Sequence, residues 1–524
     1  MVNFCPLTRM KMAVLCTLAA ALMGRSVGAL PPPERSYKIL MLLPVSSASH
    51  NRVFKPVAEG LADRGHKVMM LTDIPVASQH PNITEIQHGL AYFSLAKKNM
   101  FVVRKNENYD GLKRTMVSFA KNLYKVPAVK ELYQRRKEFD LVIVSHKLNE
   151  MTYPFVHEVP FITIVTPGLD PEHSSILGNV LMPSFVPEIQ FVPRSFQMSV
   201  WERFENTVWR IAFSFIWRQW RVMPLVQEEI SAQFPDLPPL LEIERNQSLS
   251  LLNTHFSIST TVPLLPSQVE VGAMHCRPGR ALSEDLESWI AGAGTEGVIY
   301  FSLGSVTRGE TMPPEYRQAF LKAFRRLPQR VLWKYEGELE GVSDNVMISS
   351  WLPQQDILAH NNVKVFISHG GLLSFQESIF HSTPLLVLPI FGDQPRNAMY
   401  VENSGLGHMM EWEELTADRI VDALTDIITN AKYRETVSAM SASLRDQLTT
   451  PQERAVFWSE YVIRHRGAPQ LRCPATQLSW VEFLLLDVVG LLLLALLVLL
   501  LLLRCFLRAA STVVFGTYSK NKLE

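Results

Sequence analysis

Polar side chains recur between Trp351 and Pro395 within a run whose apolar pattern is typical of a buried α/β core. The chain turns through His369, Gly370 and Gly371 from the apolar stretch VKVFIS into LLSFQESIF. Glycines at a strand-to-helix turn let backbone amides come close to a ligand, and the start of a helix favours an anion. This turn is therefore predicted to bind a phosphate group.

Two further polar pairs lie close to that turn in the sequence. Ser374 and Glu377 are three residues apart, so they share one face of the predicted helix. A carboxylate at that place can accept hydrogen bonds from both hydroxyl groups of a ribose. Asp393 and Gln394 follow the next predicted strand, and a carboxylate beside an amide suits the hydroxyl groups of a sugar ring.

Trp351 and Gln354 precede this group and suit a nucleobase, since a tryptophan offers a flat face and a glutamine offers an amide. Each residue also has an ordinary explanation when taken singly. Trp351 could belong to the core, His369 could be a loop histidine and Glu377 could lie on a solvated helix face. Their order and spacing together favour a site for a base, a ribose, a diphosphate and a sugar.

The elements that must position these residues alternate between strand and helix. The first half contains YKILMLLPV, the amphipathic stretch RVFKPVAEGLADRG and then HKVMMLT, which predicts a βαβ unit and a parallel sheet. Similar strands follow in FDLVIVS and PFITIVT, and the second half alternates again from GVIYFSLGS to PLLVLPI. The predicted fold class is α/β, with two facing doubly wound Rossmann-like domains whose strand carboxyl ends meet at one cleft.

Two segments interrupt or imitate this pattern. Residues 183–239 are rich in Pro, Trp and Phe and lack periodicity, so irregular helices and loops over the cleft are expected there. Residues 292–297, GAGTEG, satisfy the dinucleotide pattern G-x-G-x-x-G letter by letter. That pattern needs a strand before it and a helix after it, and here the order is reversed, so a helix stop is predicted.

The two ends of the chain carry targeting features. Residues 1–29 have the layout of a cleavable secretory signal, and Phe483–Leu503 supplies the roughly 20 apolar residues that cross a bilayer. Arg504 and Arg508 come next, and this positive charge predicts a cytoplasmic tail at residues 504–524. Between the ends, an N-terminal acceptor-binding domain is expected at residues 30–275 and a C-terminal donor-binding domain at residues 276–477.

Charge and composition limit the partners. The formal net charge of +1 provides no basic field for a nucleic acid backbone. The chain contains no D-x-D triplet, so a metal-dependent sugar-nucleotide site lacks its usual ligands and no metal is expected. One disulfide, between Cys276 and Cys473, stays open, as does assembly into a homo-oligomer.

The stretch from Trp351 to Pro395 resembles the signature of the UDP-glycosyltransferases, membrane-anchored enzymes of the endoplasmic reticulum with a GT-B fold. HGGLLS and FGDQ resemble the invertebrate members, and the similarity extends from RGHKV and LGNVLMPSFVP to WSEYVIRHRGA. It implies a UDP-sugar as co-substrate, no further cofactor, and a small lipophilic acceptor. Glucose is the implied sugar, with glucuronate as the alternative.

The resemblance also implies a location and a set of donor contacts. The location is the endoplasmic reticulum membrane, as a single-pass type I protein with lumenal domains, and Lys520 with Lys522 resembles a dilysine retrieval signal. Leu373 departs from the pattern, because many relatives have asparagine there. The implied contacts are Trp351 and Gln354 at the uracil, Glu377 at the ribose, Ser305, His369, Gly371 and Ser374 at the diphosphate, and Asp393 and Gln394 at the sugar.

In this family an N-terminal histidine deprotonates the acceptor, which attacks the anomeric carbon and inverts its configuration while UDP leaves. His50 matches that histidine and is expected in the loop after the first strand. The position of its carboxylate partner falls on Ser145, which carries no charge, while Asp140 is expected at the beginning of the strand, away from the cleft. Glu150 is predicted as the substitute if its loop folds back, and His146 as a second base is the alternative.

Three functional hypotheses follow. The first is an active sugar transferase that uses His50 and Glu150. The second is a UDP-sugar-binding protein whose catalysis is impaired, because Ser145 stands at the carboxylate position. The third is a membrane receptor or transporter subunit that shares only the fold.

Overall fold

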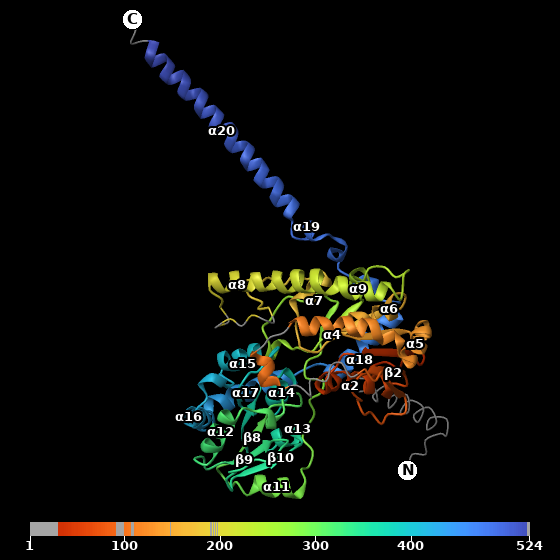
Figure 1. The fold of residues 1–524 in the computed structure, drawn as a ribbon, viewed down its shortest axis with the longest axis vertical. Helices are drawn as coiled ribbons and strands as arrows, with labels where there is room; N and C mark the ends of the chain where they lie inside the picture. The colour runs from red at the N-terminus through yellow and green to blue at the C-terminus, as the bar shows by residue number, and fades with distance from the viewer. Residues whose placement is uncertain are drawn as a thin grey trace, which may run out of the picture. The chain divides into compact units, whose positions relative to one another are not determined.

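The computed structural model describes residues 30–90, 99–105, 109–146, 148–188, 191, 193, 195 and 197–520, so the predicted signal at residues 1–29 lies outside it. The chain forms two compact units, of which the first ends at Leu471 and the second begins at Arg472. The first unit contains two parallel sheets, one in each lobe of Figure 1. The prediction of two doubly wound α/β domains is therefore confirmed.

Seven strands form the N-terminal sheet in the order β3-β2-β1-β4-β5-β6-β7. The order reverses between β1 and β4, which are parallel neighbours, so the crevice at their carboxyl ends is the switch point where such sheets bind ligands. The strands are β1 Lys38–Leu43, β2 Lys67–Thr72, β3 Ile83–Gln87, β4 Leu141–Ser145, β5 Phe161–Val165, β6 Leu249–Leu252 and β7 Gln268–Glu270.

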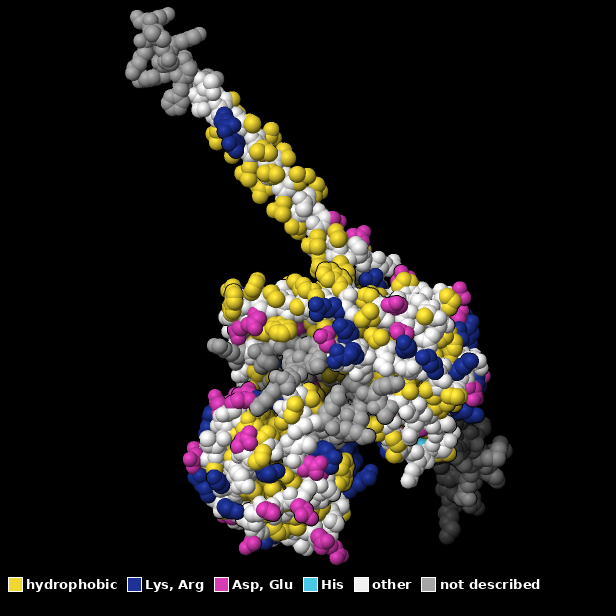
Figure 2. All heavy atoms as spheres, in the orientation of Figure 1, with side chains coloured by type: hydrophobic (Ala, Val, Ile, Leu, Met, Phe, Trp, Pro, Cys, Tyr) yellow, Lys and Arg dark blue, Asp and Glu magenta, His cyan; other side chains and the backbone are white. Residues whose placement is uncertain are grey.

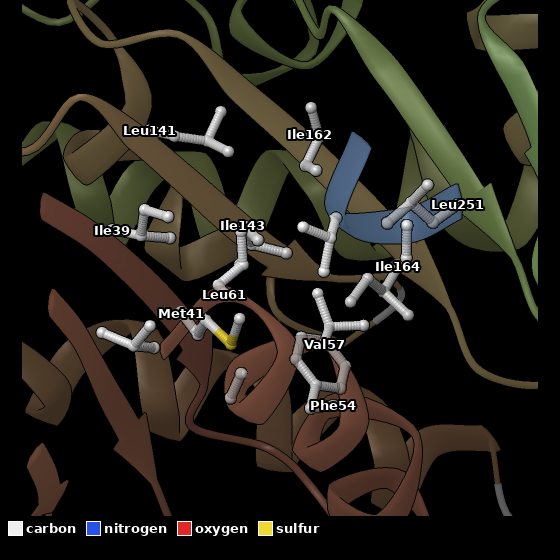
Figure 3. Close-up of a cluster of buried hydrophobic side chains, with 14 of the residues drawn as sticks. Ile39, Met41, Phe54, Val57, Leu61, Leu141, Ile143, Ile162, Ile164 and Leu251 are labelled. Atoms are coloured by element: carbon white, nitrogen blue, oxygen red, sulfur yellow. The ribbon is translucent and has the colours of Figure 1, made fainter. Parts of the chain in front are cut away.

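Helix α2, Ala48–Asp63, covers one face of this sheet. Its apolar residues Phe54, Val57 and Leu61 recur at helical spacing and are buried against the strands (Figure 3). The strand side chains in this cluster include Ile39, Met41, Leu141, Ile143, Ile162, Ile164 and Leu251. The other helices of this lobe are α4 Tyr109–Asn122, α5 Pro127–Gln134, α6 Tyr153–Val156, α7 Pro171–Ile176 and α10 Leu240–Arg245. Helix α3, Met100–Lys105, instead packs into the C-terminal core, where the ring of Phe101 contacts Trp412.

Irregular helices and loops were expected at residues 183–239, and loops are present at residues 183–188 and 232–239, but residues 200–231 form one continuous helical run with a π-helix at its centre. It consists of α8 Val200–Ile211, a π-helix at Ala212–Val222 and α9 Met223–Ser231. The outer face of α8 exposes apolar side chains four residues apart, at Val200, Phe204 and Val208, which Figure 2 shows as a yellow row. The opposite face of α8 is polar and turned inward, where Asn206 is buried and Arg210 pairs with Glu188.

Six strands form the C-terminal sheet in the order β10-β9-β8-β11-β12-β13, with a switch point between β8 and β11. The strands are β8 Val298–Ser302, β9 Arg330–Lys334, β10 Val346–Ser349, β11 Val363–Ser368, β12 Leu385–Val387 and β13 Gly407–Met409. The helices are α11 Glu284–Ala291, α12 Pro314–Phe324, α13 Gln354–Leu358, α14 Leu372–Phe380, α15 Gln394–Asn403, α16 Ala417–Thr429 and α17 Ala431–Arg445. Gly292 caps α11 ahead of β8, so GAGTEG is a helix stop as predicted.

Helix α18, Pro451–Arg464, packs on the N-terminal domain, although the predicted boundary places it in the C-terminal one. Figure 1 draws it in blue beside the red α2. Glu460 of α18 accepts hydrogen bonds from Arg64 and pairs with His66, and Val456 joins the N-terminal core. These partners are far apart in sequence, so a division based on a single cut point cannot place α18 correctly.

The second unit contains α19, Trp480–Phe483, and α20, Leu486–Lys520. Within the described residues, one helical segment is long and apolar enough to cross a membrane, Leu486–Thr512, with a mean hydropathy of 3.1. The expected span at Phe483–Leu503 falls largely within it, but α20 begins at Leu486 because α19 ends at Phe483 and Leu485 has a φ of 55°.

Two further expectations concern single residues. Lys522 of the predicted retrieval signal lies outside the described residues. Cys276 is a free thiol, so it forms no bridge to Cys473.

Candidate active site

A cavity of about 630 Å³ lies where the two switch points face each other, and both domains line it. The predicted donor-binding and catalytic residues come together in its wall, although their roles stay predictions. These residues are His50, Glu150, Ser305, Trp351, Gln354, His369, Gly371, Ser374, Glu377, Asp393 and Gln394.

The imidazole of His369 lies between two glycines at the C-terminal switch point. A Cβ atom on Gly371 would lie 2.6 Å from Nε2 of His369, and one on Gly304 would lie 2.7 Å from Cε1. Nδ1 of His369 is buried without a hydrogen-bond partner in the described structure. Burial, together with nearby Lys334, lowers the pKa of His369 to about 4, so at neutral pH the ring offers a hydrogen bond rather than a charge.

The glutamate predicted at the ribose is held by two amides. Gln354 donates to one oxygen of Glu377 at 2.6 Å, and Gln355 donates to the other at 3.2 Å. Gln354 also contacts the hydroxyl of Ser374 at 3.0 Å. Burial raises the pKa of Glu377 to about 7, so this carboxyl group changes charge near physiological pH.

Trp351 leaves an indole ring available at the mouth of the cavity, with 60% of its surface exposed. The guanidinium of Arg52, from α2 of the other domain, lies 5.6 Å from the centre of that ring. An exposed tryptophan face beside a cation suits stacking with a planar base. Arg52 was not predicted from the sequence, because a lone arginine on an amphipathic helix gives no signal of its role.

Asp393 and Gln394 lie at the start of α15, next to the glycine turn. Asp393 accepts hydrogen bonds from the amide of Leu372 at 3.2 Å and from Asn397 at 2.8 Å, and burial raises its pKa. Gln394 accepts from the amides of Ile390 and Phe391. Asp393 therefore ties α15 to α14, and both side chains have fixed orientations at the cavity wall.

Lys334 is a cavity residue that sequence reasoning missed. It ends β9, is buried, and forms an ion pair with Glu336. A lysine in the apolar strand RVLWKYE looks like an ordinary edge residue. Its position beside His369 puts a cation near the predicted diphosphate contacts.

On the N-terminal side, His50 lies in the first turn of α2 rather than in a loop. Ser47 caps that helix and accepts a hydrogen bond from the amide of His50 at 3.3 Å. Nδ1 of His50 has no hydrogen-bond partner within the described residues, and burial lowers the pKa of His50 to about 4. Ser145 ends β4 with its hydroxyl buried and likewise without a partner there.

Glu150 is bound to Arg218 and not to His50, so the predicted contact between Glu150 and His50 does not form. Arg218 belongs to the π-helix and lies 3.3 Å from Glu150, 3.4 Å from Glu172 and 2.6 Å from Glu244. All four side chains are buried. The guanidinium attracts the Glu150 carboxylate more strongly than a neutral imidazole can, which explains why the loop does not fold back toward His50.

His146 also lines the cavity, immediately after β4. Its Nε2 lies 2.9 Å from Oδ2 of Asp170. Asp140 precedes β4 as predicted and binds Arg35 and the amide of Lys38 instead. The N-terminal switch point therefore presents two histidines, and the one that has a carboxylate partner is His146.

The arrangement of two facing Rossmann-like domains around such a cavity is the GT-B fold. The fold matches the crystal structure of the glycotransferase of kitacinnamycin with a TM-score of 0.57 and 19% identity, covering 83% of this chain and 100% of that chain. At this identity the likeness shows the fold alone.

The sequence comparisons show the family. The profile described as UDP-glucoronosyl and UDP-glucosyl transferase matches residues 38–520. UDP-glycosyltransferase UGT5 of Dactylopius coccus is 35% identical, over 93% of this chain and 95% of that protein. UDP-glucosyltransferase 2 of the same organism is 33% identical, over 92% and 93%. The chain belongs to the UDP-glycosyltransferase family.

Proposed function

We propose that this chain transfers glucose from UDP-glucose to a hydroxyl group of a small lipophilic acceptor, with inversion at the anomeric carbon. The observation that carries the proposal is the single cavity in which the predicted donor contacts of the C-terminal domain face a histidine pair of the N-terminal domain. Transfer requires the donor and the nucleophile to be held close together. A cavity lined by both domains can bind the donor on one side and the acceptor on the other.

The N-terminal wall supports a lipophilic acceptor. Beside its polar residues it includes aliphatic and aromatic side chains from the loops after β1 and β4, from α4 and from the π-helix, and such side chains gain free energy when apolar surface is removed from water. These side chains are Val45, Leu112, Met116, Leu148, Phe213 and Trp217.

One observation favours glucose over glucuronate. A relative that matches almost the whole chain carries the name UDP-glucosyltransferase 2. UDP-glucuronate is the alternative donor.

The donor side would stabilise the departing UDP. The amides around Gly371, the imidazole of His369 and the cation of Lys334 all lie at one end of the cavity, where charge would develop as the sugar–phosphate bond breaks. Glu377 would hold the ribose and Trp351 the uracil.

We also propose that the chain is a type I protein of the endoplasmic reticulum membrane, held by α20, with its first unit in the lumen. The apolar segment Leu486–Thr512 and the arginines Arg504 and Arg508 support this orientation. Asn82-Ile83-Thr84 and Asn246-Gln247-Ser248 are acceptor sequons for N-glycosylation, so glycosylation of either asparagine in cells would report a lumenal location. Changing Lys520 and Lys522 to Ser should release the protein to later compartments, and an unchanged location would assign retention to α20.

The function is tested by incubating the membrane-bound full-length protein with UDP-glucose or UDP-glucuronate and a panel of phenols and alcohols. We expect UDP release that depends on the acceptor, faster with UDP-glucose, and a β-linked product by NMR. Binding of UDP-glucose without any release would instead support the impaired binding protein. Failure to bind either UDP-sugar would contradict both hypotheses.

A further inference from the structure

The N-terminal switch point contains two histidines that follow adjacent strands. His50 follows β1 and His146 follows β4, and these strands are parallel neighbours. Both side chains line the cavity in which the acceptor is proposed to bind. Either ring could therefore take a proton from the acceptor, and their surroundings distinguish them.

Asp170 fixes the ring of His146 in one orientation. Its carboxylate is fully buried; one oxygen lies 2.9 Å from Nε2 of His146, and the other accepts the amides of Glu172 at 2.9 Å and His173 at 3.4 Å. Since the carboxylate can only accept there, Nε2 of His146 carries the proton. Nδ1 is then the basic nitrogen.

The backbone around His146 is also held in place. Its amide donates to the carbonyl of Ile164 on β5 at 3.0 Å, and its ring lies 4.3 Å from the ring of His173, which contacts the hydroxyl of Ser250 at 3.0 Å. A base that is fixed by a strand, a carboxylate and a neighbouring ring needs little reorganisation to accept a proton.

His50 has none of this support. No carboxylate contacts it in the described structure, because Ser145 at the end of β4 carries no charge and Glu150 is bound to Arg218. Burial also disfavours its charged form. A base that cannot stabilise the proton it accepts contributes little to the transfer.

We propose that His146 is the general base of the transfer in this chain and that Asp170 is its positioning residue. The inference rests on the proposed function. The acceptor O–H bond breaks and its proton moves to Nδ1 of His146, while the acceptor oxygen forms a bond to the anomeric carbon. The bond from that carbon to the phosphate oxygen breaks with its electron pair, so UDP departs as an anion. The imidazolium, stabilised by Asp170, later releases the proton to water.

The test compares two phenols of similar size with UDP-glucose as donor. 4-Nitrophenol is largely ionised near pH 8 and needs no base, whereas 4-methoxyphenol must be deprotonated. His146→Gln keeps an N–H donor toward Asp170 but removes the base. We expect it to lower kcat for 4-methoxyphenol by about 10²- to 10⁴-fold and to change kcat for 4-nitrophenol by less than about 10-fold.

Two further measurements separate catalysis from structure. Added imidazole should restore turnover of 4-methoxyphenol by His146→Ala, which a purely structural role would not allow. Asp170→Asn should impair 4-methoxyphenol selectively, and both His146 variants should bind UDP as the native protein does. His50→Ala should lower kcat less than His146→Gln.

The outcomes distinguish the inference from the proposed function. If the native protein transfers glucose and His146→Gln keeps its rate with 4-methoxyphenol, or loses both phenols equally, the inference is overturned and the function stands. If His50→Ala alone shows the selective loss, His50 is the base. If the native protein binds UDP-glucose but transfers to neither phenol, the proposed function is overturned and the inference with it.

Discussion

The two switch points of this chain have the same geometry and different chemistry. At the C-terminal one, His369 lies between glycines and beside the buried cation Lys334. At the N-terminal one, His146 pairs with Asp170, and a buried arginine binds three carboxylates close by. The first side is suited to binding the donor through hydrogen bonds. The second is suited to accepting a proton in a site from which water is largely excluded.

The comparison shows where the stability of each side resides. On the donor side, amides hold the buried carboxyl group of Glu377, and the cation Lys334 has its own carboxylate partner in Glu336. On the acceptor side, three buried carboxylates share one cation, Arg218. Removing the partner of a buried charge costs more than removing a neutral hydrogen bond.

The largest expected effect is therefore on the acceptor side. Arg218→Met leaves Glu150, Glu172 and Glu244 without their shared cation and should lower the free energy of unfolding by about 3–5 kcal/mol. Thermal unfolding of the first unit measures it. Arg419→Met, which breaks the exposed pair with Glu414, is the control and should change stability by less than about 0.5 kcal/mol. Equal losses of stability in the two variants would show that the ion pairs of Arg218 contribute no more than an exposed ion pair.

The donor side should show its own dependence on pH through Glu377. Burial raises the pKa of this carboxyl group from 4.5 to about 7, so the folded chain binds the proton more tightly than the unfolded chain does. The resulting stabilisation is complete below pH 4.5 and is lost as pH rises through 7, a change of about 3 kcal/mol. The free energy of unfolding of the native protein, measured from pH 4.5 to above pH 7, should fall by this amount relative to that of Glu377→Gln. Parallel stability curves would contradict the assignment.

The sugar end of the cavity should be separable from the nucleotide end. Asp393→Ala removes a hydrogen-bond acceptor proposed for the sugar hydroxyls. It should lower kcat/KM for UDP-glucose by a factor that corresponds to a loss of about 2 kcal/mol in transition-state stabilisation. Affinity for UDP alone, measured by calorimetry, should change far less. An equal loss for UDP would place Asp393 at the nucleotide, or show that its bond to the amide of Leu372 holds the whole turn.

The smallest expected effect is at the mouth of the cavity. Trp351 is 60% exposed, so Trp351→Ala should cost about 1 kcal/mol in UDP affinity, at the low end for stacking of a base. Trp351→Phe keeps an aromatic face and should recover most of it. An unchanged affinity in the alanine variant would remove Trp351 from the uracil contacts.

The donor side was predictable because its residues follow one another in sequence. The stretches VKVFIS and LLSFQESIF became β11 and α14 with the bounds that their apolar pattern indicates. The polar residues around them line one cavity, since parallel strands bring their carboxyl ends to one edge.

The acceptor side was less predictable because its contacts join distant segments. Asp170 lies 24 residues beyond His146, and Arg218 lies 68 residues beyond Glu150. Nothing local indicates that Arg218 would attract Glu150 away from His50. The sequence therefore identified the histidines and the absent carboxylate at Ser145, and the fold determined which histidine has a partner.

The return of α18 to the N-terminal domain has a consequence for exchanging parts between relatives. A hybrid enzyme joined once, near residue 276, would bring a foreign α18 onto this N-terminal core. A Cβ on Gly60 would lie 2.8 Å from Val456, and Gln452 donates to the carbonyl of Pro56, so the two surfaces must match closely. Acceptor preference should therefore transfer intact only when the first domain and residues 451–468 move together, with two junctions instead of one.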